Sequence, residues 1–141
     1  LKNIASKHDL TLMNVTLRYV PKVNREEDGL LTPYSQEGPQ IAVVLYFNID
    51  ESRDIDQGLL VDYDGSEWTQ ELIGEVHKLG GTFYWPYHKW WNTQQIVLGQ
   101  ENSLGEFFHI KQDMDPENLF TNDFLEALSQ SFRAYEKVKT K

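Results

Sequence analysis

The sequence predicts an α+β fold, an antiparallel sheet with helices packed mainly on one face and a helical C-terminal tail. Two observations favour this class. Strand-like patterns come early in the chain, and apolar residues at helical spacing dominate the second half. The 141 residues fit one domain, and 40% hydrophobic residues are enough to form a core.

The first strand is expected at residues 11–20, TLMNVTLRYV, because apolar and polar side chains alternate there. Pro21 ends the strand, since proline has no N–H group to donate to a ladder. The alternation separates two faces, an apolar one with Met13, Val15, Leu17 and Tyr19 and a polar one with Asn14, Thr16 and Arg18.

Two further strands, a short edge strand and two irregular segments are expected between residues 22 and 85. Residues 22–39 are polar and contain glycine and proline, so we expect a loop. Residues 40–47, QIAVVLYF, are apolar on both faces and predict a central strand covered on both sides. The acidic segment 50–64 is irregular, with a short edge strand at 58–61, and a third strand is expected at 82–85.

A helix is expected to begin at Ser66, because its apolar residues recur at helical spacing until Gly80 and Gly81 end it. His77 lies on this helix, and we expect it to be solvated. In the second half, further helices are expected to start at Asn92 or Thr93, at Ser103, and at Asp123, which has capping-box spacing to Glu126. Asp115-Pro116 is expected to start a short turn, with the aspartate as cap and the proline at the first helical position.

Charge and composition exclude several classes of partner. The net charge of −9 argues against a nucleic-acid surface and against binding to anionic membranes. No apolar run has the length of a membrane span. The chain has no cysteine, which suits either a reducing or an oxidising compartment, and a cytoplasmic location is slightly favoured. The histidines are too scattered to predict a metal site.

Arg18 on the polar face of the first strand is one candidate functional residue. The simplest explanation of this pattern is a solvated face. The alternative is a binding face, because an arginine on a rigid strand holds its donor fork in place for an oxygen-rich ligand.

The second candidate feature is the aromatic run GGTFYWPYHKWW at residues 80–91, which holds six aromatic rings, a histidine and a lysine. These rings either pack in the core, form a wall of a ligand site, or face another domain.

The same run, extended to GGTFYWPYHKWWNTQQIV and followed by FFHIKQDMDPENLFTNDF, resembles the C-terminal end of FAD-linked oxidases of the vanillyl-alcohol-oxidase type. The nearest branch is that of the sugar-lactone and alditol oxidases. Their tail carries a lysine-x-x-x-D-P-x-x-x-F motif, which is matched here by Lys111, Asp115, Pro116 and Phe120.

This resemblance implies that residues 1–141 are one domain, the C-terminal cap or substrate domain of a larger oxidase whose FAD-binding domain is absent from this chain. In such oxidases the cap sheet closes over the flavin and shapes the substrate pocket. The first residues, LKNIASKHDL, agree with this expectation, since they read like the last turns of a helix cut from a longer chain.

The relatives carry a Glu-x-Arg triplet on a cap strand, which corresponds to Thr16-Leu17-Arg18 here, so a threonine replaces the glutamate. Their later His-Trp-x-Lys run corresponds to Tyr84-Trp85-Pro86-Tyr87, or to His88 and Lys89 in a shifted register. The resemblance thus implies catalytic residues Arg18, Tyr84 and His88, substrate-binding residues Thr16, Tyr46, Tyr87 and Lys89, and a flavin contact at Asn118.

The resulting hypothesis is a substrate-binding cap of an FAD-dependent oxidoreductase that oxidises an alcohol-type or sugar-like substrate by hydride transfer to flavin. Its partners are the parent FAD-binding domain and a small molecule, and the isolated chain is expected to be inactive. The alternatives are a stand-alone aromatic-rich carbohydrate-binding module and a small regulatory domain that dimerises through its sheet.

Overall fold

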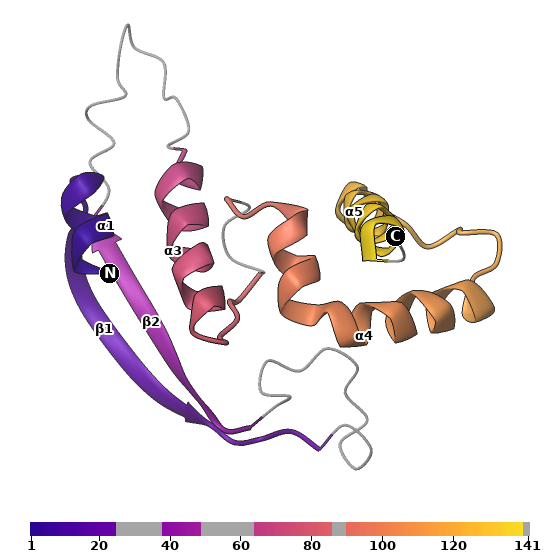
Figure 1. Ribbon diagram of the computed structural model, residues 1–141, viewed down its shortest axis with the longest axis horizontal. Helices are drawn as coiled ribbons and strands as arrows, with labels where there is room; N and C mark the ends of the chain where they lie inside the picture. The colour runs from indigo at the N-terminus through magenta and orange to yellow at the C-terminus, as the bar shows by residue number, and fades with distance from the viewer. Residues whose placement is uncertain (25–37, 49–63, 86–89, 140–141) are drawn as a thin grey trace, which may run out of the picture.

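The computed structural model has the predicted α+β class and describes residues 1–24, 38–48, 64–85 and 90–139. Its elements in chain order are α1 (Lys2–Lys7), β1 (Thr11–Val20), β2 (Gln40–Asn48), α3 (Ser66–Lys78), α4 (Thr93–Met114) and α5 (Asp123–Lys139). Figure 1 shows α3 beside the sheet, with α4 and α5 on the other side of α3. The sheet and the C-terminal helix pair therefore lie at opposite ends of the molecule.

β1 and β2 pair antiparallel and form the two-stranded sheet of the described chain. Thr11 aligns with Asn48 at one end of the pair, and Val20 aligns with Gln40 at the other. A bulge at Met13 shifts the register by one residue, so that no residue lies directly opposite Met13. The first strand has its predicted bounds, and the second extends one residue further than predicted.

The prediction that the second strand is covered on both sides is wrong. Ile41 and Val43, on one side of β2, are 59% and 52% exposed, and Tyr46, on the other, is 50% exposed. In the described sheet β2 has one neighbouring strand, and a single helix lies against one end of it. The short edge strand predicted at 58–61 lies outside the described residues.

α3 begins at Ser66 as predicted and meets the sheet through Trp68. The Trp68 ring contacts Phe47 of β2 edge to face, with ring centroids 5.1 Å apart. Gly80 ends the helical segment with φ at +72°, a conformation that glycine adopts without a Cβ clash.

α1 is held on α3 by the carboxylate of Glu71. Its Oε2 accepts hydrogen bonds from His8 Nε2 at 2.9 Å and from Lys7 Nζ at 2.7 Å. The bond from His8, and then that from Lys7, lowers the pKa of Glu71. Ile4 is 5% exposed, so the short helix also contributes an apolar contact.

The predicted third strand is absent, because residues 82–85 form an irregular connection between α3 and α4. Phe83 and Trp85 pack against the core that α4 and α5 share. The position of this segment thus depends on side-chain burial among the helices and not on ladder hydrogen bonds.

α4 is capped by Asn92, one of the two expected cap residues, which forms a capping box with Gln95. Its side chain accepts from Gln95 N at 3.0 Å, and Gln95 Oε1 accepts from Asn92 N at 3.1 Å. The two helices predicted for this region form one element, with a kink at Gln100, where φ is −140°. Ser103, the predicted start of the second helix, lies inside that element and is buried.

α3 and α4 are joined by side-chain amides, and Gly99 of α4 lies close to the side chain of Thr82 in the connection between them. Gln70 Nε2 donates to the carbonyl of Trp90, and Gln95 Nε2 donates to the carbonyl of Gln70, both at 2.9 Å. A Cβ on Gly99 would lie only 2.9 Å from Thr82 Oγ1, so glycine permits this approach.

α5 begins at Asp123, but the predicted cap residue is wrong. Asn122 Oδ1 accepts from Leu125 N at 2.9 Å, which makes Asn122 the capping side chain. A cap residue lies one position before the first helical residue, and Asp123 already belongs to the helix. Two consecutive polar residues at the helix start made this position ambiguous in the sequence.

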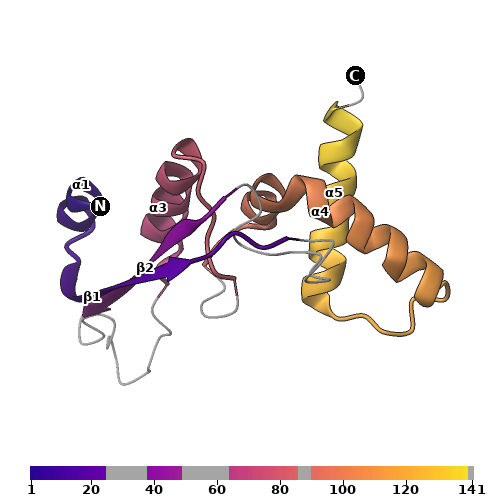
Figure 2. The ribbon, with the colours of Figure 1, turned by 90° about the horizontal axis from the view of Figure 1, so that it is seen from below.

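The main core lies between α4 and α5. Ile96, Val97 and Leu104 of α4 meet Leu128 of α5, and all four are at most 2% exposed. Partly buried rings surround them, namely Phe83, Trp85, Trp91, Phe108, Phe124, Phe132 and Tyr135. Figure 2 shows α5 crossing α4, which brings Leu128 against residues on both arms of the kinked helix.

We predict that Leu128→Ala lowers the free energy of unfolding by about 2–5 kcal/mol, because it removes a buried side chain and leaves a cavity. Urea unfolding followed by circular dichroism measures the change. Val138→Ala is the matched control, since Val138 lies on the same helix and is 74% exposed. An equal loss in both variants would contradict this description of the core.

Candidate functional site

Three of the sequence-predicted site residues share one face of the sheet. Directly opposed residues of an antiparallel pair point to the same side, and the register pairs Asn14 with Tyr46, Thr16 with Val44 and Arg18 with Ala42. Arg18, Thr16 and Tyr46 therefore lie together on one face, with Arg18 and Tyr46 exposed and Thr16 half-buried.

The bulge at Met13 places Tyr46 on this face. Without the extra residue, the alignment at the Thr11 end would continue and put Tyr46 opposite Met13, among the apolar side chains. Because side chains alternate between the two faces, a one-residue shift changes which β1 side chains share a face with each β2 side chain. Tyr46 thus joins Arg18 and Thr16 because of a local irregularity in β1.

The other face of the sheet is apolar and is the side that meets α3. It contains the pairs Val15–Leu45, Leu17–Val43 and Tyr19–Ile41, and it continues to Phe47, which contacts α3. Leu17 and Tyr19 are 65% and 69% exposed, so α3 covers only one end of this face. The polar face with Arg18 is consequently directed away from α3.

Most described rings of the aromatic run pack inside the chain, in agreement with the core alternative. Phe83, Trp85 and Trp91 surround the core, and Trp91 Nε1 donates to the carbonyl of Trp85 at 2.9 Å. Trp90 lies edge to face on Trp68, with ring centroids 5.7 Å apart.

Tyr84 is the exposed ring of the described run, with 53% of its surface accessible. It belongs to the connection between α3 and α4, whereas Arg18 belongs to the hairpin. The other predicted site residues of the run, Tyr87, His88 and Lys89, lie outside the described residues.

The tail motif forms a connected turn at the end of α4. The carboxylate of Asp115 accepts from Lys111 Nζ, from Leu119 N at 2.8 Å and from Phe120 N at 2.9 Å. Lys111 Nζ also donates to Asn118 Oδ1 at 3.0 Å. The bond from Lys111, together with the two backbone N–H groups, holds the pKa of Asp115 below its ordinary value.

The short turn predicted to start at Asp115-Pro116 is present, and Asn118 N donates to the carbonyl of Asp115 at 3.0 Å. Asp115 ends α4, and no helix begins at Pro116. Asn118 has φ at +52°, the left-handed region that asparagine tolerates best after glycine. The turn leaves Leu119 and Phe120 73% and 79% exposed. The sequence showed the motif but gave no signal that its phenylalanine faces outward.

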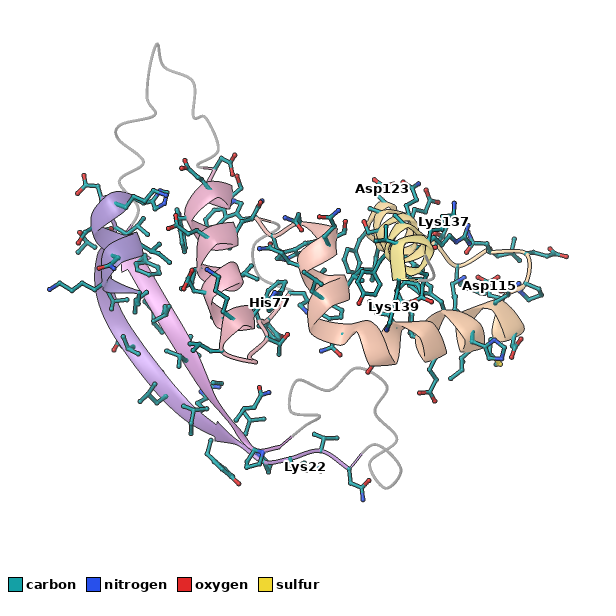
Figure 3. All side chains as sticks on the ribbon, in the orientation of Figure 1. Lys22, His77, Asp115, Asp123, Lys137 and Lys139 are labelled. Atoms are coloured by element: carbon teal, nitrogen blue, oxygen red, sulfur yellow. The ribbon has the colours of Figure 1, made fainter. Side chains whose placement is uncertain are left out.

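The fold does not bring Asn118 to the polar sheet face. The turn that holds Asn118 lies at the far end of α4, beside the labelled Asp115, whereas Lys22 lies at the lower middle of the view and the hairpin runs from there away from α4 (Figure 3). The described residues therefore do not frame a flavin by themselves. In the arrangement that the resemblance implies, the contacts to FAD come mainly from the other domain.

The expectation that His77 is solvated holds only in part, because the residue is half-buried. Its Nε2 is buried without a hydrogen-bond partner among the described residues, and its ring lies 5.9 Å from that of Phe83. Burial lowers the pKa of His77, because it disfavours the charged form. The label in Figure 3 places it at the end of α3 that faces α4.

The chain matches no protein-family model, no curated protein and no solved structure. In the described ranges, no group of three or more His, Asp or Glu side chains is placed to hold a metal ion. Of the helices described, none combines the length and the apolar character that a membrane crossing requires.

We predict that Asp115→Asn weakens the tail turn, because the amide loses the charge that binds Lys111. A lowered carboxyl pKa stabilises the fold above the unfolded value of about 3.9, and this contribution is lost as pH falls through the folded pKa. The variant should unfold at lower urea than the wild type at pH 7, and the difference should shrink below about pH 4.

Asp113→Asn is the control for this measurement. Asp113 lies on the same helix, its side chain is 67% exposed, and its contact with His109 is 3.6 Å long. We expect a smaller change in the urea midpoint at pH 7. Equal midpoints for Asp115→Asn and the wild type at pH 7 would show that the turn does not depend on this charge.

Proposed function

We propose that this chain is the substrate-binding cap of an FAD-dependent oxidoreductase that acts on an alcohol-type or sugar-like substrate. The observation that carries the proposal is the hairpin, which has Arg18, Thr16 and Tyr46 on one open face. Its opposite, apolar face is largely exposed at Leu17 and Tyr19. A two-stranded sheet with open apolar surface gains stability from a companion structure.

The tail supports the same proposal. The motif residues of the resemblance, Lys111 and Asp115, act as one hydrogen-bonded unit with Asn118. Their turn presents Met114, Leu119 and Phe120 at 81%, 73% and 79% exposure. Exposed apolar patches of this kind commonly mark contacts with another protein surface. The chain thus has open apolar surface at both ends, which is the expected property of a lid on a second domain.

In this proposal the chain's own residues bind and orient the substrate. The Arg18 guanidinium donates hydrogen bonds to a substrate oxygen and stabilises negative charge that develops there. The hydroxyls of Thr16 and Tyr46 donate to or accept from neighbouring substrate hydroxyls. A bound flavin supplies the acceptor for the hydride.

The carbohydrate-module alternative has less support. Stacking on sugar requires exposed rings, and all four tryptophans of the chain are half-buried in contacts with other residues of the chain. A saturable quench of tryptophan fluorescence by soluble glycans would favour the module. Dimerisation through the sheet is supported by the exposed apolar face at Leu17 and Val43, and sedimentation equilibrium of the isolated chain tests it.

The proposal predicts that the isolated chain binds no flavin and has no activity. Joined to its FAD-binding domain, it should form a yellow protein whose flavin colour bleaches anaerobically with substrate. In that protein Arg18→Ala should lower the rate of flavin reduction about 100-fold or more, because a donor at the reacting oxygen is lost. Stopped-flow absorbance measures the rate.

Arg133→Ala is the control, since it removes the same charge from an exposed position on α5. Circular dichroism melting should show both variants folded, because Arg18 is exposed and adds little burial. A parent polypeptide without an FAD-binding half would refute the proposal. Loss of folding with normal turnover in the remaining folded Arg18→Ala protein would assign Arg18 a structural role.

A further inference from the structure

The polar sheet face differs in charge from the rest of the chain. The described hairpin residues, 11–24 and 38–48, contain two cations, Arg18 and Lys22, and no aspartate or glutamate. The whole chain has a net charge of −9. Exposed charges more than about 8 Å apart are largely screened at physiological salt, so the nearest charges dominate the potential at this face. The charged side chains of the described part of the hairpin are thus both cationic.

Arg18 has no ion-pair partner among the described residues. Thr16 and Arg18 point to the same side of β1, so the residue at position 16 is the nearest neighbour of Arg18 along that face. A carboxylate at this position would pair with the guanidinium, whereas the threonine hydroxyl leaves its charge uncompensated. The cation is thus exposed on a face whose other side chains are uncharged: the polar Asn14, Thr16 and Tyr46 and the apolar Ala42 and Val44.

The spacing of these groups fits a short polyhydroxylated chain. Side chains two positions apart on a strand are ~6.6 Å apart, and diagonal cross-strand neighbours are ~7–8 Å apart. Thr16 and Arg18 have the first relation, and Thr16 and Tyr46 have the second. A ligand of about this length can therefore meet the guanidinium at one end and the two hydroxyls along its body.

We propose that this face binds a carboxylate-bearing polyhydroxy compound, a sugar acid, in preference to a neutral polyol. The carboxylate forms paired hydrogen bonds with two N–H groups of the planar Arg18 guanidinium, a geometry that a single hydroxyl does not match. The remaining N–H groups of Arg18 can still donate to the reacting hydroxyl oxygen beside the carboxylate. Thr16 and Tyr46 contact the ligand's hydroxyls. As a substrate class this assignment rests on the proposed function, although the binding itself needs only this chain.

The test is a titration of the isolated chain with two matched probes, D-gluconate and sorbitol. Gluconate has a carboxylate at the end where sorbitol has a hydroxymethyl group. Proton–nitrogen NMR spectra that include the arginine Nε–H signals report binding residue by residue, with ionic strength held constant by sodium chloride. We expect gluconate to shift the signals of Arg18 and Thr16 in a saturable manner. Sorbitol should produce smaller shifts without saturation at the same concentrations.

Arg18→Gln should weaken gluconate binding about tenfold or more, because it removes a charge-assisted hydrogen bond. Arg133→Gln removes the same charge from the exposed surface of α5 and should leave the affinity unchanged. Equal loss in both variants would show nonspecific attraction to positive charge and overturn the proposal. Equal affinity for sorbitol, or no gluconate binding by the wild type, would also overturn it.

Failure of this inference is distinguishable from failure of the proposed function. The titration involves no flavin, so gluconate binding by the chain together with a parent polypeptide that lacks an FAD-binding domain would refute only the proposed function. Conversely, flavin bleaching in the joined protein by neutral polyols, with none by the corresponding acids, would refute only the sugar-acid assignment.

Discussion

The packing of Leu128 into the bend of α4 is the interaction on which the rest of the structure depends. The kink at Gln100 turns Ile96 and Val97 on one arm of α4, and Leu104 on the other, toward the same space. α5 fills that space with a single buried leucine and a ring of aromatic side chains. Apolar burial is the largest favourable contribution to folding. This core therefore determines the position of the segment before α4, whose aromatic side chains pack against it.

The aromatic run illustrates the consequence. Phe83, Trp85 and Trp91 are drawn into the periphery of the α4–α5 core, and Trp90 is held on Trp68 of α3. A segment that looks suited to a binding wall is thereby used mainly to join three helices. The hairpin takes no part in that core, and its exposed side chains remain available for a ligand or another domain.

The two ends of the molecule carry different kinds of open surface. At one end, the hairpin has a polar face with Arg18 and an apolar face that α3 covers only near Phe47. At the other end, the Lys111–Asp115 pair stiffens a turn from which Leu119 and Phe120 project. The hydrogen bonds of that turn satisfy its backbone while leaving its apolar side chains exposed, an arrangement suited to contact with a second surface.

The sequence by itself determined the elements whose signals are local. Alternation gave β1 its bounds and put Arg18 and Thr16 on one face, the capping residue Asn92 began α4, and helical spacing gave α3 and α5. These features depend on neighbours within a few residues, so one sequence suffices to read them. Only the tertiary structure decided that residues 82–85 pack on helices and that the Nε2 atom of the half-buried His77 is buried. It also decided that the bulge at Met13 brings Tyr46 to the side of Arg18. Burial and strand register depend on residues that are distant in the sequence. The local pattern of a segment does not show which of these residues will pack against it or pair with it.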